Sequence, residues 1–178
     1  MKIQVMMPDN ILSRYSAKVS RLSDGEARRA FAAAVNHEGD KGRTQVKRAL
    51  VRQTGVKYNS IEQGMRTLRA HPNSLAYQLE QSGNETNISE FGAKATGKGV
   101  SASPWNKRRV FTSSFRVEKA GGKVFLRIGK SRYPIKQIYG PNIAREIIKD
   151  ESGETWESTG SQLSDRVGHE LNRILSKL

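Results

Sequence analysis

The chain has 178 residues, no cysteine and a formal net charge of +14 at pH 7. This length fits one domain with a modest core, and the lack of cysteine excludes a disulfide framework and thiolate chemistry. No apolar run approaches the roughly 20 residues that span a bilayer, and Gln4 and Pro8 interrupt any signal-peptide core, so we expect a protein made in a reducing cytoplasm.

The N-terminal region predicts a short strand over residues 3–6 and then a helix over residues 9–22. Asp9 or Asn10 can cap this helix, because a short polar side chain accepts a hydrogen bond from the first free backbone amides. Its apolar residues recur at helical spacing through Leu22.

The clearest element in the sequence is a helix over residues 24–53. Ser23 and Glu26 match a capping box, in which each side chain bonds to the backbone amide of the other residue. Gly39 and Gly42 each cost about 1 kcal/mol relative to alanine inside a helix, but the phase of the apolar stripe favours one continuous helix. The stripe comprises Ala27, Ala30, Phe31, Ala34, Val35, Val46, Ala49 and Leu50.

Shorter elements follow this helix. A third helix is expected from Asn59 or Ser60, with Met65 and Leu68 on its packed face, and Pro72 ends it. Alternating apolar and polar residues over 75–80 predict a strand. A flexible basic loop over residues 92–99 then leads to a short strand over residues 100–102.

Two apolar-rich runs flank Gly121-Gly122 and predict a tight β-hairpin. If the two glycines form the turn, Phe115 lies opposite Ile128 and Arg116 lies opposite Arg127. Like charges are normally avoided across a strand pair, so the face with the arginines should meet an anionic surface or open water. The other face should build the core, from Phe115, Val117, Val124, Leu126 and Ile128.

The C-terminal region predicts a short helix after Gly140-Pro141 and an acidic mobile loop over residues 150–160. An amphipathic helix over residues 161–178 should pack on the domain formed by residues 1–149. The fold class is therefore α+β, with long N-terminal helices packed on a small antiparallel sheet and a C-terminal amphipathic helix.

The positive charge is concentrated in one quarter of the chain. Residues 94–136 hold twelve basic side chains and one acid, Glu118, which gives a net charge of +11. Such a field attracts phosphate backbones or acidic protein surfaces. A well-solvated basic face without a partner is the alternative.

Two segments resemble phosphate-binding loops but lack essential residues. Gly97-Lys98 follows Gly92 at Walker A spacing, but Gly99 stands where serine or threonine must ligate magnesium. Gly129-Lys130-Ser131 lacks the first glycine, because Val124 occupies that position. We interpret both as loops.

Nothing else in the sequence indicates catalysis. The histidines His37, His71 and His169 are scattered without metal-ligand spacing. No basic or hydroxyl partner accompanies the carboxylates of the C-terminal region. We therefore expect no catalytic residue, no metal and no cofactor, and we expect that the protein is not an enzyme.

Aromatic residues alternate with arginine and lysine in the basic region, an arrangement that can stack single-stranded bases. No zinc-finger, RNP-like or recognition-helix motif accompanies them. In the predicted register Phe125 lies on the arginine face, where it either covers a second layer or anchors a partner. The candidate docking residues are Arg108, Arg109, Arg116, Phe125, Arg127, Lys130, Arg132 and Lys136.

Several segments between residues 25 and 148 resemble the phage minor tail protein Z family. The most specific part is Arg132-Tyr133-Pro134-Ile135-Lys136 followed by Tyr139-Gly140-Pro141, although Tyr133 stands where the family pattern has leucine. Residues after Asp150 show no distinctive match. The other matching segments are 32–36, 40–44, 46–50, Phe111, Phe115 and 124–127, and the motif residues themselves are Pro134, Ile135, Tyr139, Gly140 and Pro141.

The resemblance implies a structural protein of the virion that completes the tail of a long-tailed phage or prophage at its head-proximal end. Such a protein would form a homo-oligomeric ring, help join tail to head and be assembled in the bacterial cytoplasm. Its implied partners are other tail or connector ring proteins, with the end of the viral DNA as an alternative and no membrane. A nucleic-acid-binding module unrelated to virions is the alternative function, and a nuclease lacks acidic metal ligands near the basic region.

Overall fold

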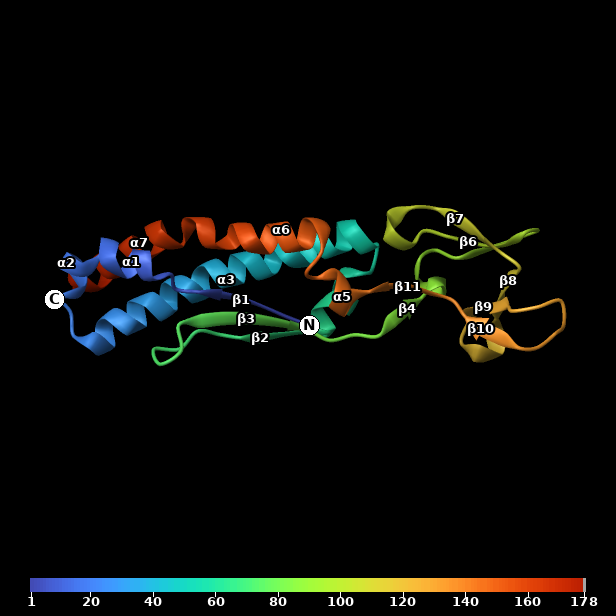
Figure 1. Cartoon of the computed structure of the whole chain (residues 1–178), viewed down its shortest axis with the longest axis horizontal. Coiled ribbons are helices and arrows are strands. Elements are labelled where there is room, and N and C mark those ends of the chain that lie inside the picture. Colours follow the sequence, from blue (N-terminus) through green and yellow to red (C-terminus); the bar gives the residue numbers. More distant parts are fainter. Residues whose placement is uncertain (178) are drawn as a thin grey trace.

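The computed structural model describes residues 1–177 and confirms the α+β class. A helical body occupies one end of an elongated molecule and small antiparallel sheets occupy the other (Figure 1). Leu178, the last residue of the expected C-terminal helix, lies outside the described residues.

The long helix α3 (Asp24–Thr54) confirms the predicted start and its continuity. The Ser23 hydroxyl accepts a hydrogen bond from the Glu26 amide while the Glu26 carboxylate accepts one from the Ser23 amide, so the capping box is complete. Gly55 ends the helix in the left-handed conformation, with φ of 73°. Gly39 and Gly42, in the middle of the helix, are both buried against neighbouring elements.

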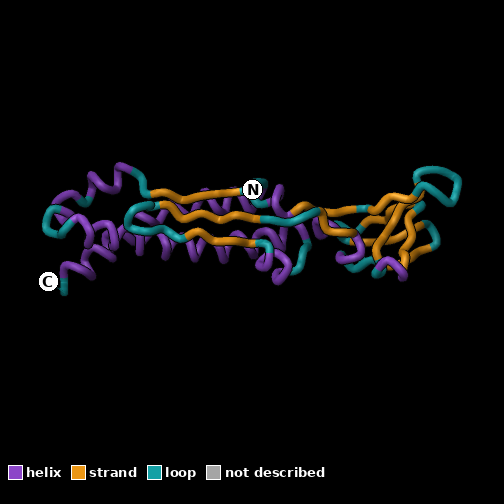
Figure 2. The backbone as a smooth tube through the Cα atoms, turned by 90° about the horizontal axis from the view of Figure 1, so that it is seen from below, coloured by secondary structure: helices purple, strands orange, loops and turns teal. Residues whose placement is uncertain are grey.

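The helical body has three layers. Helices α6 (Asp150–Ser158) and α7 (Leu163–Leu175) lie along one side of α3, and a three-stranded sheet lies along the other side (Figures 1 and 2). This sheet has the order β1 (Lys2–Met6), β3 (Ala76–Gln81), β2 (Met65–Leu68). The core between the layers includes Phe31, Val35, Val46, Leu50, Tyr77, Leu79, Trp156, Leu163 and Leu171.

The helix expected over residues 9–22 is two shorter helices, α1 (Asp9–Arg14) and α2 (Ser16–Val19). They meet at Tyr15, whose hydroxyl donates a 2.9 Å hydrogen bond to the carbonyl oxygen of Ser164, in the first turn of α7. This contact to the C-terminal helix accompanies the break between α1 and α2.

The third helix is shorter than predicted. Helix α4 (Tyr58–Gln63) ends at Gly64, and Met65 and Leu68 lie in β2 instead. Pairing with β3 buries Met65 and gives the backbone N–H and C=O groups of this segment hydrogen-bond partners. Sheet formation therefore overrides the helical spacing of the apolar residues.

The prediction of a mobile acidic loop over residues 150–160 is wrong. Most of the segment is α6, which follows the short helix α5 (Ile143–Glu146), and Trp156 is 5% exposed. The fully buried Ser152 hydroxyl lies 2.8 Å from the Glu146 carbonyl oxygen and 3.0 Å from Gln53 Oε1. One aromatic anchor and one buried hydroxyl attach this polar helix to the body.

Three small antiparallel sheets form the strand-rich end of the described chain. Strand β4 (Glu85–Asn87) pairs with β11 (Tyr139–Asn142), next to the helical body. The second sheet has the order β5 (Lys94–Thr96), β6 (Gly99–Ala102), β7 (Arg109–Thr112). The third has the order β10 (Ile135–Gln137), β9 (Lys123–Arg127), β8 (Ser114–Val117) and lies farthest from the body (Figure 1).

The hairpin of β8 and β9 forms, but its predicted register is wrong. Phe115 lies opposite Phe125, and Arg116 lies opposite Val124. The connection spans residues 118–122 and contains a 3₁₀ turn before Gly121 and Gly122, whose φ angles are 70° and 71°. This five-residue loop shifts the pairing by three positions, and an odd shift exchanges the two faces.

The corrected register separates the two arginines. Arg116 forms a 3.0 Å ion pair with Glu118, whereas Arg127 shares the opposite face with Phe115. Val124 is fully buried, but Ile128 is 63% exposed and lies beyond the end of β9. The predicted contact between Arg116 and Arg127 is therefore wrong, as is the placement of Phe115 and Ile128 in one shared core face.

Candidate anion-binding surface

The basic residues of segment 94–136 all lie in the strand-rich end, and all twelve are exposed. Among residues 1–177, the structure pairs only one of them with a carboxylate, Arg116 with Glu118. In the helical body, by contrast, several cations pair with carboxylates, as in Lys47–Glu62 and Arg69–Asp40. The strand-rich end therefore carries a positive field that internal ion pairs leave largely uncompensated.

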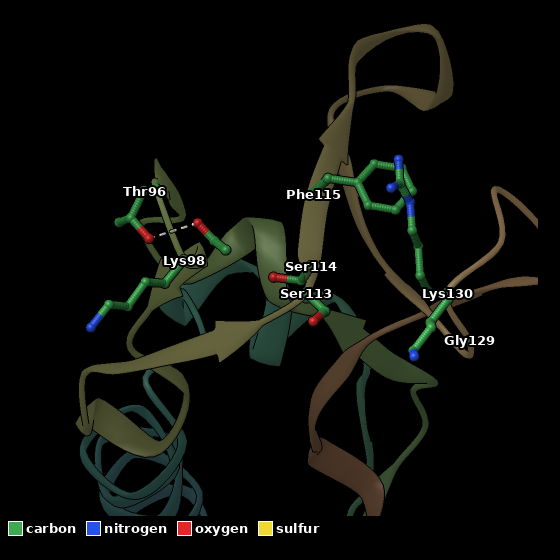
Figure 3. Close-up of a pocket in the computed structure, with 10 residues that line it drawn as sticks. Thr96, Lys98, Ser113, Ser114, Phe115, Gly129 and Lys130 are labelled. Atoms are coloured by element: carbon green, nitrogen blue, oxygen red, sulfur yellow. Dashed lines mark hydrogen bonds between the residues drawn. The ribbon is translucent and has the colours of Figure 1, made fainter.

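A groove of about 480 Å³ opens within this basic end. Figure 3 shows Thr96 and Lys98 on one side, Phe115, Gly129 and Lys130 on the other, and Ser113 and Ser114 between them. We call it the two-loop groove, because the turn between β5 and β6 forms one rim and the start of the β9–β10 connection forms the other. Its lining residues are Thr96, Gly97, Lys98, Gly99, Ser113, Ser114, Phe115, Arg127, Gly129 and Lys130.

Ser113 joins the two rims through its backbone. Its amide donates to the Lys98 carbonyl oxygen at 3.2 Å, and its carbonyl oxygen accepts from the Arg127 amide at 3.5 Å. Ser113 is the single residue between β7 and β8, and its φ of 59° lies in the left-handed region that side chains disfavour. One strained residue thus connects the two sheets that hold the basic rims.

Close packing also fixes the first rim. A Cβ at Gly99 would overlap the Phe111 carbonyl oxygen on the neighbouring strand β7, so only glycine fits there. The Ser114 hydroxyl accepts a 2.9 Å hydrogen bond from the Val100 amide and donates to the Phe111 carbonyl oxygen. These contacts hold β6, β7 and β8 together beneath the groove.

The aromatic ring of Phe115 lies inside the groove and positions a cation. The Arg127 guanidinium carbon is 5.1 Å from the ring centroid, within the range of a cation–π contact. Phe115 also stacks with Phe125, its partner across the strand pair, at a centroid distance of 6.5 Å. Phe125 is therefore partly covered by Phe115, as a second-layer residue would be.

The remaining candidate docking residues do not gather at the groove. Arg109 lies over the Phe111 and Trp105 rings, at 4.7 and 5.6 Å from their centroids. Arg108 donates a hydrogen bond to the Ser101 hydroxyl, and the Arg132 guanidinium lies 5.7 Å from the centroid of the Tyr133 ring.

Two further candidates also lie outside the groove. Arg116 is held by Glu118, and Lys136 lines a separate hollow of about 330 Å³ with Leu126 and Tyr139. The structure thus brings only Arg127 and Lys130 of the candidate set together at the groove.

The motif residues that carry the family resemblance differ in burial. Pro134 follows a cis peptide bond, and Ile135 begins β10. In β11, Pro141 is buried, and a Cβ at Gly140 would meet the Phe91 ring at 2.9 Å. Pro134 and Tyr139 are exposed, so only part of the motif packs against neighbouring elements, and none of its residues lines the groove.

Sequence reasoning missed Thr96, Lys98 and Ser113 as groove residues. Gly97-Lys98 and Gly129-Lys130 do carry a signal in the sequence, but each belongs to an incomplete phosphate-loop motif and predicts only a loop by itself. Only strand pairing in the folded chain brings the two dipeptides to one groove.

Titratable groups with shifted pKa values lie in the helical body. Burial raises the pKa of the Tyr77 phenol well above its usual range, and the hydrogen bond to Asp40 adds to this effect. The 2.8 Å hydrogen bond from Lys47 lowers the pKa of the Glu62 carboxyl. Among residues 1–177, no group of three His, Asp or Glu side chains is placed to hold a metal ion.

Comparisons of the chain with protein-family models, with curated proteins and with solved structures give no match. No helix within the described range is both long enough and apolar enough to cross a membrane. Fold and surface therefore define an α+β protein with a basic, grooved end opposite a helical body.

Proposed function

We propose that the chain is a structural protein of the phage virion, which completes the tail at its head-proximal end and helps join tail to head. It would act through ring assembly and electrostatic docking, with other tail or connector ring proteins and the end of the viral DNA as its candidate partners. The resemblance of several segments between residues 25 and 148 to the minor tail protein Z family supports this assignment.

The concentration of unpaired positive charge in segment 94–136 is the observation that carries the docking part of the proposal. All twelve cations of segment 94–136 are exposed, and the only carboxylate in that segment already pairs with Arg116. A surface of this kind accelerates the approach of anionic partners and fixes their orientation more than it adds raw affinity. Joining two large preformed assemblies is a step that benefits from such steering.

A nucleic-acid-binding module outside any virion is the second candidate. The same uncompensated basic end favours it, because neutralised phosphates release counterions and so drive non-specific binding. The two candidates differ in the location of the protein, which is the virion tail in the first and outside any virion in the second.

Localisation on purified particles tests the leading proposal. The chain, with a short tag after α7, would be produced in a lysogen that carries the gene, and released particles would be labelled with gold for negative-stain imaging. Helix α7 ends far from the groove, so the tag leaves the basic end free. We expect label at the head-proximal end of the tail. Particles without label, with the protein remaining in the cell lysate, would exclude the virion role and favour the second candidate.

A further inference from the structure

The two incomplete phosphate-loop motifs meet in space. Gly97-Lys98 lies on one rim of the two-loop groove and Gly129-Lys130 lies on the other, although some thirty residues separate them in sequence (Figure 3). Neither segment is a phosphate site by itself, because neither precedes a helix whose N-terminus could hold the anion. Together they place glycine and lysine on both sides of one polar depression.

We propose that the two-loop groove binds the phosphodiester backbone of a nucleic acid, which would cross it from rim to rim. This inference rests on the proposed function, because it names the partner of the same basic surface. It assigns a role to Lys98, Lys130 and Arg127 that neither the charge count nor the family resemblance specifies.

The chemistry of the lining favours phosphate. Lys98 supplies a cation on one rim, and Arg127 and Lys130 supply two on the other. No carboxylate is among the described residues that line the groove, so these charges face no internal competitor. The Ser113 hydroxyl lies between the rims and adds a neutral hydrogen-bond donor of the kind that often contacts phosphate oxygens (Figure 3).

The groove also leaves room for close approach of a backbone. Nothing lies within 4 Å of the position that a Cβ would occupy at Gly97 or at Gly129. Lys98 extends away from the centre of the groove in Figure 3, and its flexible four-carbon stem lets the ammonium follow a polymer that leaves over that rim. A single small anion would use one rim, whereas a polymer contacts both.

The apolar content of the groove argues against an acidic protein as the occupant. Protein interfaces are built around buried aromatic and aliphatic anchors, whereas interfaces with nucleic acid are more polar and strongly positive. Among the described lining residues, Phe115 is the only large apolar one, and the Arg127 guanidinium already lies over its ring. The groove therefore offers cations and hydroxyls but no free apolar anchor.

The test is binding of the full chain to a short fluorescent DNA duplex of mixed sequence, measured by anisotropy at several salt concentrations. The groove variant is Lys98→Ala with Lys130→Ala. The matched control is Lys119→Ala with Lys123→Ala, which removes the same charge from exposed sites outside the groove. Thermal melting followed by circular dichroism checks that both variants fold.

We expect the groove variant to lose roughly tenfold in affinity and to lower the slope of log K against log salt by about 2, since each phosphate contact contributes about 0.9. The control should lower the slope by less than 1. Equal losses in both variants, or unchanged binding by the groove variant, would overturn the proposal. So would tighter binding of poly-glutamate than of DNA, which would indicate an acidic protein partner. These outcomes are independent of whether gold label is found on tails, so the two proposals fail separately.

Discussion

The ring of Tyr77 lies directly against Gly39, at the middle of α3, so that a Cβ on Gly39 would overlap three ring atoms. The ring is fully buried and its hydroxyl donates a 2.9 Å hydrogen bond to Asp40, one residue further along α3. Gly39 therefore permits the sheet of β1, β3 and β2 to approach the helix closely.

We expect Gly39→Ala to lower the free energy of unfolding by up to about 2 kcal/mol. Overpacking typically costs about 1–3 kcal/mol, and the gain in helix propensity of about 1 kcal/mol offsets part of that cost. Gly25→Ala is the matched control, because Gly25 lies in the same helix with nothing within 4 Å of the added Cβ. Urea unfolding of both variants measures the difference, and a Gly39→Ala protein as stable as the control would contradict the packing argument.

The sequence predicts that α3 is continuous, but it does not show why the helix contains Gly39 and Gly42. The capping box and the phase of the apolar stripe are local features that the sequence displays directly. The need for Gly39 and Gly42 arises from Tyr77 and Thr159, which approach from elements far away in sequence. A sequence pattern shows the cost of a glycine but not the neighbour that requires it.

Tyr77 also makes the stability of the folded protein depend on pH in the alkaline range. The pKa of Tyr77 is raised above its ordinary value of 10.0, first by burial and then by the hydrogen bond to Asp40. A raised pKa means that the folded state holds its proton while the unfolded state loses it, so the associated stability is fully present below pH 10 and decreases above it. We expect the unfolding free energy of the wild type to fall, relative to Tyr77→Phe, by about 1.4 kcal/mol per pH unit above pH 10.

Equilibrium unfolding between pH 8 and pH 11 measures this difference. Subtracting the Tyr77→Phe curve removes the contribution of lysines and other tyrosines, which titrate in both proteins. A constant difference across the whole range would mean that the Tyr77 phenol titrates normally.

The acidic segment that begins at Asp150 should behave as a packed helix. Trp156 is buried and its ring centroid lies 6.3 Å from that of Tyr77. We expect the α6 amides around Trp156 to exchange slowly with solvent, and Trp156→Ala to cost about 3–5 kcal/mol. Glu157→Ala, at an exposed neighbour, should change stability by less than about 0.5 kcal/mol. Rapid exchange throughout α6 would contradict its packing against α3.

The composition of this segment explains why it was mistaken for a loop. Asp150, Glu151, Glu154 and Glu157 lie on the solvent side, and the packed side offers one tryptophan together with serine and threonine. Apolar periodicity is therefore absent even though the helix is buried on one face. The buried hydroxyl of Ser152 replaces the apolar contact that a sequence pattern would reveal.

The hairpin register was predicted wrongly, and the groove was not predicted, for a different reason. Gly121-Gly122 fits both a two-residue turn and the end of a longer loop, and the 3₁₀ turn before it decides the register. The groove depends on that register, because it sets which side of β9 carries Arg127. Lys98 joins the site only through the pairing of β5, β6 and β7 and the connection at Ser113.

The corrected register also changes how the docking surface should be tested. Arg116 is held by Glu118 on the face away from Arg127, so Arg116→Glu would chiefly place two carboxylates together. Arg127→Glu with Lys130→Glu reverses two charges on one rim of the groove instead. Lys119→Glu with Lys123→Glu is the matched control, because it changes the net charge equally at exposed sites in the same hairpin.

We expect the Arg127→Glu, Lys130→Glu protein to fold but to leave heads and tails unjoined when it replaces the wild-type chain in a phage. The reversed charges would repel the anionic partner at the point of docking, whereas the control keeps the groove intact and changes only the surrounding field. Circular dichroism checks folding, and electron microscopy of lysates counts free heads, free tails and joined particles. A small joining defect in the control, relieved by raising the salt concentration, would fit long-range steering, because salt screens such fields. Normal joining by the Arg127→Glu, Lys130→Glu protein would show that this rim of the groove does not take part in docking.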